Sequence, residues 1–346
     1  MGMHELLQKD PDIWDLFCRK EEYPPSLRDK YNRFPYYASQ YRTIFEPKAS
    51  EFLMKNGYHV EYPDEKPFAV CLTHDIDSVC KSFASKSFKA AKKFTRGKFI
   101  ESIDSMKEIP RKKDPLVNFQ EIMKLEDKYN ACSSFYFLAL DPADRDYAYQ
   151  IEDLEEEIQT IQSWGWEVGL HGGHEGSRDL TKLKKEKRNL EKVTKTAITG
   201  CRNHYLNFVV PDTWESLRKA GFLYDCSLGY ADCIGFRNGM CHPYKPFNLN
   251  TGKIIEIIEI PQVIMDVSLF DDYMRLDFEK AWAVTRQLIN TVAECHGVIT
   301  LLWHNHSLIG DKRNLYEKIL QYCAEKEAWM TSGEHIATWW KANSED

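Results

Sequence analysis

Acidic, histidine and arginine side chains recur in this sequence directly after short apolar runs. The run 68–73 is followed by His-Asp75-Ile-Asp77. Four later segments show the same arrangement, namely Gly-Leu-His171-Gly-Gly-His174-Glu175, Arg202-Asn-His204-Tyr205, Met265-Asp266 and Leu301-Leu-Trp-His304. A single aspartate at such a place is often only a cap or a turn former. Five such segments together favour a shared reactive site.

Carboxylates combined with imidazoles are typical of a divalent metal site in a hydrolase. Asp77 and His171 are the expected ligands, with His174 or Glu175 as the third. The two glycines between His171 and His174 allow the sharp backbone turn that would bring both side chains to one ion. We expect zinc, with cobalt, manganese or nickel as alternatives.

The remaining polar residues suit proton transfer. Asp75 is two residues from Asp77 and could take a proton from water. Arg202 would keep that carboxylate ionised and oriented. His304 could protonate a departing nitrogen, and Asp266 could raise its pKa for that role.

These residues need a scaffold that brings strand ends together. Apolar runs predict buried strands at 68–73, 134–139, 167–170, 254–260 and 298–303. Amphipathic stretches predict helices at 118–129, 149–163, 180–195, 213–220 and 278–295. Strands that alternate with helices indicate a parallel sheet or a β/α barrel, in which reactive residues gather at the carboxyl ends of the strands.

Two regions lie outside this alternation. Residues 1–66 are rich in aromatic and charged residues and predict a short helical N-terminal appendage to a barrel over residues 67–346. Residues 81–98 interleave lysines with phenylalanines. This pattern predicts either a helix that packs its phenylalanines on the barrel or a platform for an anionic carrier.

Composition narrows the function classes. The chain has 346 residues and a formal net charge of −7, so nucleic acid is not the expected partner. No window approaches the ~20 apolar residues of a membrane span. Ten cysteines without a C-x-x-C pair, and a start without a secretory pattern, predict reduced thiols and a cytoplasmic location.

The order of these motifs resembles the polysaccharide deacetylase family with the NodB homology domain, the fourth family of carbohydrate esterases. The resemblance covers roughly residues 67 to 340 and rests on Thr-His-Asp75-Ile-Asp77, the loop led by His171, Arg202-x-x-Tyr205 and Leu301-x-x-His304. It implies a distorted barrel of the (β/α)7 type and removal of N- or O-acetyl groups by a metal-bound water.

The resemblance also implies roles for single residues. Asp75 matches the catalytic base, Asp77 and His171 match metal ligands, and Arg202 matches the residue that orients the base. Tyr205 matches the position whose backbone N–H helps to hold the oxyanion, and Leu301 matches the pocket for the acetyl methyl group. His304 matches the general acid, and Asp266 lies where the family has the aspartate that tunes it.

The chain departs from the family in its second metal histidine. The family places that histidine four residues after the first, where this chain has Glu175. A second imidazole would keep the usual ligand set, which favours His174. The stretch 235–247 resembles a subgroup found with surface-polysaccharide biosynthesis, and there Arg237 either faces the substrate or belongs to a well-packed loop.

The expected function is therefore hydrolysis of an acetyl group on a sugar or glycan precursor, free or on an anionic carrier. One alternative is a cyclic-amide hydrolase, because similar barrels open ureide rings. Another is a catalytically weakened glycan-binding protein. The presence of both Asp75 and His304 argues against pure binding, which needs neither a base nor an acid.

Overall fold

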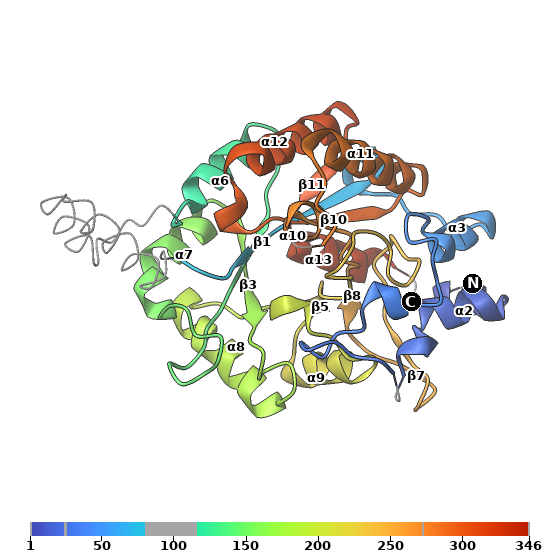
Figure 1. The fold of residues 1–346 in the computed structure, drawn as a ribbon, viewed down its shortest axis with the longest axis horizontal. Coiled ribbons are helices and arrows are strands. Elements are labelled where there is room, and N and C mark those ends of the chain that lie inside the picture. Colours follow the sequence, from blue (N-terminus) through green and yellow to red (C-terminus); the bar gives the residue numbers. More distant parts are fainter. Residues whose placement is uncertain (1, 24–25, 80–115, 272, 345–346) are drawn as a thin grey trace, which may run out of the picture.

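The computed structural model describes residues 2–23, 26–79, 116–271 and 273–344 (Figure 1). The basic stretch 81–98, for which we considered a carrier platform, lies outside these ranges. No helix within them combines the length and the apolar character that a bilayer crossing requires.

A curled parallel sheet forms the centre of the fold. Its strands are ordered β8-β5-β4-β3-β2-β1-β10-β9. A ninth strand, β11, lies outside this order and pairs in parallel with the first residues of β1. The strands are β1 (Ala69–Ile76), β2 (Ser134–Phe137), β3 (Glu167–Gly172), β4 (Gly200–Asn203), β5 (Tyr224–Asp225), β8 (Ile258–Glu259), β9 (Ile264–Met265), β10 (Val298–Leu302) and β11 (Trp329–Thr331). The expected distorted β/α barrel is thereby confirmed.

Strand β1 lies at the centre of the sheet and is buried on both faces. All eight of its residues are buried. It pairs in parallel with β10 on one side, where Leu72 lies opposite Leu301, and with β2 on the other, where Thr73 lies opposite Ser134. This double pairing directs Asp75 and the following Asp77 to the same end of the barrel as the end of β10.

Helices surround the sheet (Figure 1). They are α6 (Phe119–Asp127), α7 (Glu155–Ser163), α8 (Leu180–Thr194), α9 (Asp212–Ala220), α10 (Asp266–Phe270), α11 (Phe278–Glu294), α12 (Gly310–Glu325) and α13 (Gly333–Asn343), with the 3₁₀ turns η4 (Ile151–Leu154), η5 (His204–Leu206) and η6 (Asn305–Ser307). The five helices expected from amphipathic stretches are present as α6, α7 with η4, α8, α9 and α11. Each buries one apolar face, as α8 does with Leu183, Leu190 and Val193.

One predicted strand is only partly correct. The apolar run 254–260 contains the end of β7 (Lys253–Ile254), which pairs with β6 (Phe247–Asn248) in a separate antiparallel ribbon, and then β8 in the main sheet. Between them the Ile257 N–H donates to the carbonyl of Ile255, which bends the chain. An apolar run reports burial, and burial alone does not distinguish a strand from a buried bend.

The N-terminal segment 2–66 packs against the barrel. It contains α1 (Met3–Leu7), α2 (Pro11–Phe17), α3 (Lys48–Lys55) and the turns η1 (Lys20–Glu22), η2 (Tyr36–Ala38) and η3 (Pro63–Glu65). Apolar side chains from α1, α2 and α3 belong to the same buried core as β1. This segment therefore shares the core of the barrel.

A buried ion cluster joins this segment to the loop before β6. The carboxylate of Glu22 is fully buried and accepts from Arg19 Nε at 2.7 Å and from Arg237 Nε at 2.9 Å. A second bond from the Arg237 guanidinium reaches the other Glu22 oxygen. Arg19 also donates to the carbonyl of Arg237 at 2.6 Å.

Replacement of Glu22 by alanine is expected to lower the free energy of unfolding by about 3–5 kcal/mol, because it leaves the buried Arg237 guanidinium without a carboxylate and removes one of the two carboxylates that pair with the buried Arg19. Urea unfolding followed by fluorescence measures this loss. The control is Lys20→Ala, which removes an exposed pair with Asp15 and should cost about 0–1 kcal/mol. Equal losses in the two variants would show that the buried cluster stabilises the fold no more than an exposed ion pair does.

Candidate metal centre and active site

The strand ends that carry reactive residues meet at one end of the barrel. Asp75 lies near the end of β1 and Asp77 directly follows it, and His171 lies near the end of β3, which is separated from β1 by β2. Strand β4 is the next neighbour and is followed by His204 in η5. On the other side of β1, strands β10 and β9 lead to His304 and Asp266.

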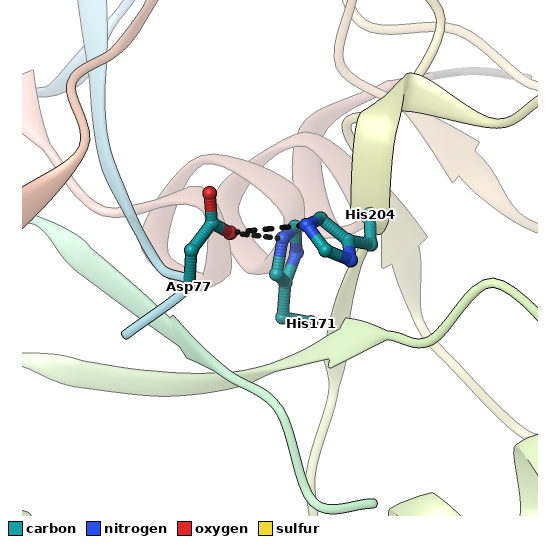
Figure 2. Close-up of side chains that lie close together, drawn as sticks. All are labelled: Asp77, His171 and His204. Atoms are coloured by element: carbon teal, nitrogen blue, oxygen red, sulfur yellow. Dashed lines mark hydrogen bonds and ion pairs between the residues drawn. The ribbon is translucent and has the colours of Figure 1, made fainter. Parts of the chain in front are cut away.

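Three of these side chains form a candidate metal site. The Oδ1 atom of Asp77 lies 3.2 Å from Nε2 of His171 and 3.4 Å from Nε2 of His204. One potential ligand atom from each residue lies within 4.8 Å of the other two. Figure 2 shows both imidazole rings directed at the carboxylate from the β3 and β4 side.

The opposite ring nitrogens are held by acceptors. His171 Nδ1 lies 2.9 Å from the carbonyl oxygen of Arg202, and His204 Nδ1 lies 3.2 Å from Oδ2 of Asp146. Because a carbonyl oxygen can only accept, the His171 Nδ1 carries the proton, and the Asp146 carboxylate favours the same tautomer in His204. Each Nε2 is then available as a ligand, which is how metal-binding histidines are usually held. One carboxylate and two imidazoles fit zinc or a similar divalent ion.

The charges around Asp77 suit a ligand that must be ionised. Burial opposes the charged carboxylate, but His304, His171 and His204 outweigh it and hold the pKa of Asp77 far below its usual range. For Asp146, burial is likewise outweighed by the hydrogen bond and charge of His204, so its pKa is also lowered. Sequence reasoning did not identify Asp146, which lies in the loop after β2 without a distinctive motif.

The third member of the cluster, His204, differs from our expectation of His174 or Glu175. The loop after β3 forms turns in which the Ser177 N–H donates to the Gly173 carbonyl. The Glu175 carboxylate pairs with Lys182 on the surface. His174 donates its backbone N–H to Asp146 at 3.1 Å, and in the described chain its Nδ1 has no hydrogen-bond partner. Neither residue joins the cluster, and His204 takes the place we gave to them.

His204 was present in our strand-end motifs without an assigned role. The register of β3 against β4 pairs His171 with Arg202. His204 lies two residues beyond Arg202, and η5 then returns its ring toward His171, with 4.9 Å between the ring centroids. The pattern of Arg202 followed by His204 was therefore the available signal, and its meaning depended on this register.

Asp75 lies beside the cluster with one free oxygen. Its side chain is buried, and in the described residues its Oδ1 has no hydrogen-bond partner. Oδ1 is 3.7 Å from Arg202 Nη1, and Oδ2 is 3.7 Å from His171 Nε2. Arg202 is held by Thr73, whose Oγ1 accepts from Nη2 at 3.1 Å. A buried carboxylate beside a fixed cation is suited to receive a proton.

His304 faces the cluster from the opposite side. Its Nδ1 lies 2.7 Å from Oδ1 of Asp266, whose Oδ2 accepts the His304 backbone N–H at 3.1 Å. Its Nε2 is 3.6 Å from Oδ2 of Asp77. Burial opposes the charged ring, but Asp266 and Asp77 outweigh it and raise the pKa of His304 to about 10. The structure thus provides a proton donor beside Asp77.

The residues expected at the substrate fall in different places. Leu301 is buried in β10, and Tyr205 lies in η5 with about 36% of its side chain exposed. Arg237 is fully engaged with Glu22 and with the Gly229 carbonyl at 2.8 Å. The expectation that Arg237 faces the substrate is therefore wrong, because its buried guanidinium donates to these internal partners, which a buried arginine needs. The alternative of a well-packed loop describes it.

Comparison with known proteins bears on the fold. No family model matches the sequence, and no curated protein matches it. A solved structure from Mycobacterium smegmatis, assigned as a polysaccharide deacetylase, is 21% identical and has a TM-score of 0.56, over 82% of this chain and 93% of that chain. Two further solved structures resemble this chain less closely. A CE4 family pseudoenzyme from Bacillus anthracis is 9% identical, with a TM-score of 0.42 over 80% of this chain and 66% of that chain. The peptidoglycan deacetylase PdaC from Bacillus subtilis is 11% identical, with a TM-score of 0.38 over 80% of this chain and 94% of that chain.

At 21% sequence identity, this structural similarity shows the fold alone. The similarity covers most of both chains in the Mycobacterium smegmatis case. It agrees with the curled parallel sheet described above. The chain therefore has the polysaccharide deacetylase fold of the NodB type.

Proposed function

We propose that this protein is a metal-dependent deacetylase that hydrolyses an N- or O-acetyl group on a sugar or glycan precursor. The observation that carries the proposal is the arrangement around Asp77, His171 and His204. Asp75 lies beside them with an oxygen that has no hydrogen-bond partner among the described residues, and the His304–Asp266 pair lies beside them as well. A general base and a general acid beside a metal site suit amide hydrolysis.

A divalent ion bound by these three residues would lower the pKa of a coordinated water and polarise the acetyl carbonyl. Asp75 takes the proton from the attacking water through its free Oδ1. Arg202 orients that carboxylate, with its Nη1 at 3.7 Å from the same oxygen. His304 delivers a proton to the leaving nitrogen from Nε2, while Asp266 holds its Nδ1. The negative charge that develops on the carbonyl oxygen would be stabilised by the bound ion and by the backbone N–H of Tyr205.

The proposal also includes the class of substrate and the cellular location of the protein. The deacetylase assignment of the Mycobacterium smegmatis structure supports an acetylated polysaccharide or its precursor. The cysteines in the described ranges are free thiols and mostly buried, which supports a reducing, cytoplasmic setting. Tyr205 and Leu301 are proposed to contact the acetyl group through a backbone N–H and an apolar side chain, respectively.

Acetate release tests the proposal. Zinc-loaded protein is expected to release acetate from N-acetylglucosamine oligomers or from nucleotide- and lipid-linked N-acetyl sugars, and removal of metal with a chelator should abolish the release. Return of zinc should restore it, which separates metal dependence from damage by the chelator. A protein that holds one equivalent of zinc and releases no acetate from any of these substrates would overturn the proposal. Opening of a cyclic amide by the same protein would favour the alternative hydrolase.

A further inference from the structure

The turn that carries His204 has an unusual backbone. Tyr205 and Leu206 follow it with φ angles of 61° and 52°. Neither is glycine, and a side chain in this left-handed region is strained and persists only where the surrounding contacts impose it. The contacts that impose this conformation therefore also determine where the His204 ring lies.

Those contacts come from the N-terminal segment (Figure 1). Arg33 Nη1 donates to the carbonyl oxygen of Tyr205 at 3.0 Å. Arg28 Nη1 donates to the carbonyl oxygen of Phe208 at 3.2 Å. Two arginines that are distant in sequence thus hold the backbone at both ends of the strained turn.

Aromatic rings connect the same segment to the metal cluster. The Tyr31 ring stacks on Tyr205, with centroids 4.7 Å apart and planes 22° apart. The Tyr205 ring in turn stacks on His204 at 3.8 Å and 17°. The imidazole is therefore limited by Tyr205 on one face and by Asp146 at Nδ1.

Arg33 is itself held rigidly. Its Nε donates to Asp29 Oδ2 at 2.8 Å, and its Nη2 donates to the hydroxyl of Tyr273 at 3.2 Å. The other oxygen of Asp29 accepts the backbone N–H groups of Tyr31 and Arg33, both at 2.9 Å. Burial opposes the charged carboxylate, but these bonds outweigh it and lower the pKa of Asp29. The guanidinium thus points at Tyr205 from a preformed loop.

We infer that Arg33 is a positioning residue for the metal ligand His204, acting through the Tyr205 carbonyl and supported by the Tyr31–Tyr205–His204 stack. The inference rests on the proposed function only in taking His204 as a metal ligand. It assigns a part of the active centre to residues 26–33, which precede the region that resembles the deacetylase family. The N-terminal segment then contributes to the site as well as to the core.

Metal affinity and a cobalt spectrum test this role. Apo-protein is titrated with zinc against a chromogenic chelator, and the visible spectrum of the cobalt form is recorded. Arg33→Ala should weaken zinc binding by about 10–100-fold, the usual effect of losing a partner that orients a ligand. The cobalt spectrum should also shift, because the geometry of an imidazole ligand changes. Arg33→Lys should not restore either property, since an ammonium group cannot donate in a fork to Asp29, Tyr205 and Tyr273.

The matched control is Arg42→Ala. Arg42 lies in the same segment and also donates to backbone carbonyls, those of Tyr36 and Tyr37, both at 3.3 Å and both within its own segment. This variant should bind zinc as the wild type does and give the wild-type cobalt spectrum. Urea unfolding shows whether each variant is folded.

Tyr31→Leu provides a second test if Arg33→Ala does not fold, because it removes the stack on Tyr205 and leaves the Asp29–Arg33 pair intact. Wild-type zinc affinity and cobalt spectrum in every folded variant of Arg33 and Tyr31 would overturn the inference. If wild-type protein binds zinc without releasing acetate, the deacetylase proposal fails while these measurements still decide the role of Arg33. A wild-type protein that binds neither zinc nor cobalt would overturn both.

Discussion

Alanine at Asp77, His171 or His204 is expected to remove the bound metal and reduce acetate release to background. Each substitution deletes one of three ligands whose potential donor atoms lie within 4.8 Å of one another. The loss of zinc affinity should exceed the ~10–100-fold that follows removal of an outer partner. Metal analysis after gel filtration, combined with acetate release, measures both effects.

Substitutions at His174 and Glu175 provide the matched controls. Both residues belong to the loop after β3, yet Glu175 pairs with Lys182, and His174 is outside the cluster. His174→Ala and Glu175→Ala proteins should keep a full equivalent of zinc. The opposite result, in which His204→Ala keeps its metal and His174→Ala or Glu175→Ala loses it, would return the third ligand to our sequence-based expectation.

Asparagine at Asp75 and alanine at His304 are each expected to lower kcat by about 10²–10⁴-fold, the usual contribution of a general base or acid. Both variants should keep zinc, because neither residue is in the ligand cluster. Steady-state kinetics with an N-acetyl sugar measures the loss, and metal analysis confirms that the site is occupied.

An activated O-acetyl ester separates the two roles. Its leaving group departs without a proton, so this substrate should largely restore the activity of His304→Ala. It should not restore Asp75→Asn, because water must still lose a proton. Equal losses in both variants on this ester would contradict the division of roles between Asp75 and His304.

The spacing of apolar residues predicted secondary structure correctly where a single strand or helix spans the whole apolar pattern. The run 68–73 predicted the buried strand β1, and the stretch 180–195 predicted α8, because the apolar residues of each follow the period of the element. The same rule was insufficient at 254–260, where two short strands join different sheets. Which sheet a short apolar segment joins depends on distant partner strands.

Long-range contacts also decided the role of Arg237. Its motif resembles a substrate-facing loop, but its partner Glu22 is 215 residues away in the sequence. A buried arginine is tolerated because this carboxylate is buried with it. No local pattern around residue 237 contains that information.

The active centre shows the same division. The gathering of Asp75, Asp77, His171, Arg202 and His304 could be predicted from the sequence, because the carboxyl ends of parallel strands meet at one end of the sheet. Only the tertiary structure shows that His204, and neither His174 nor Glu175, lies beside Asp77 and His171. This placement depends on the β3–β4 register that sets His171 opposite Arg202, and on the turn at Tyr205 that Arg33 holds from the N-terminal segment. Both are contacts between residues far apart in the chain, and the spacing of residues along a single segment does not encode them.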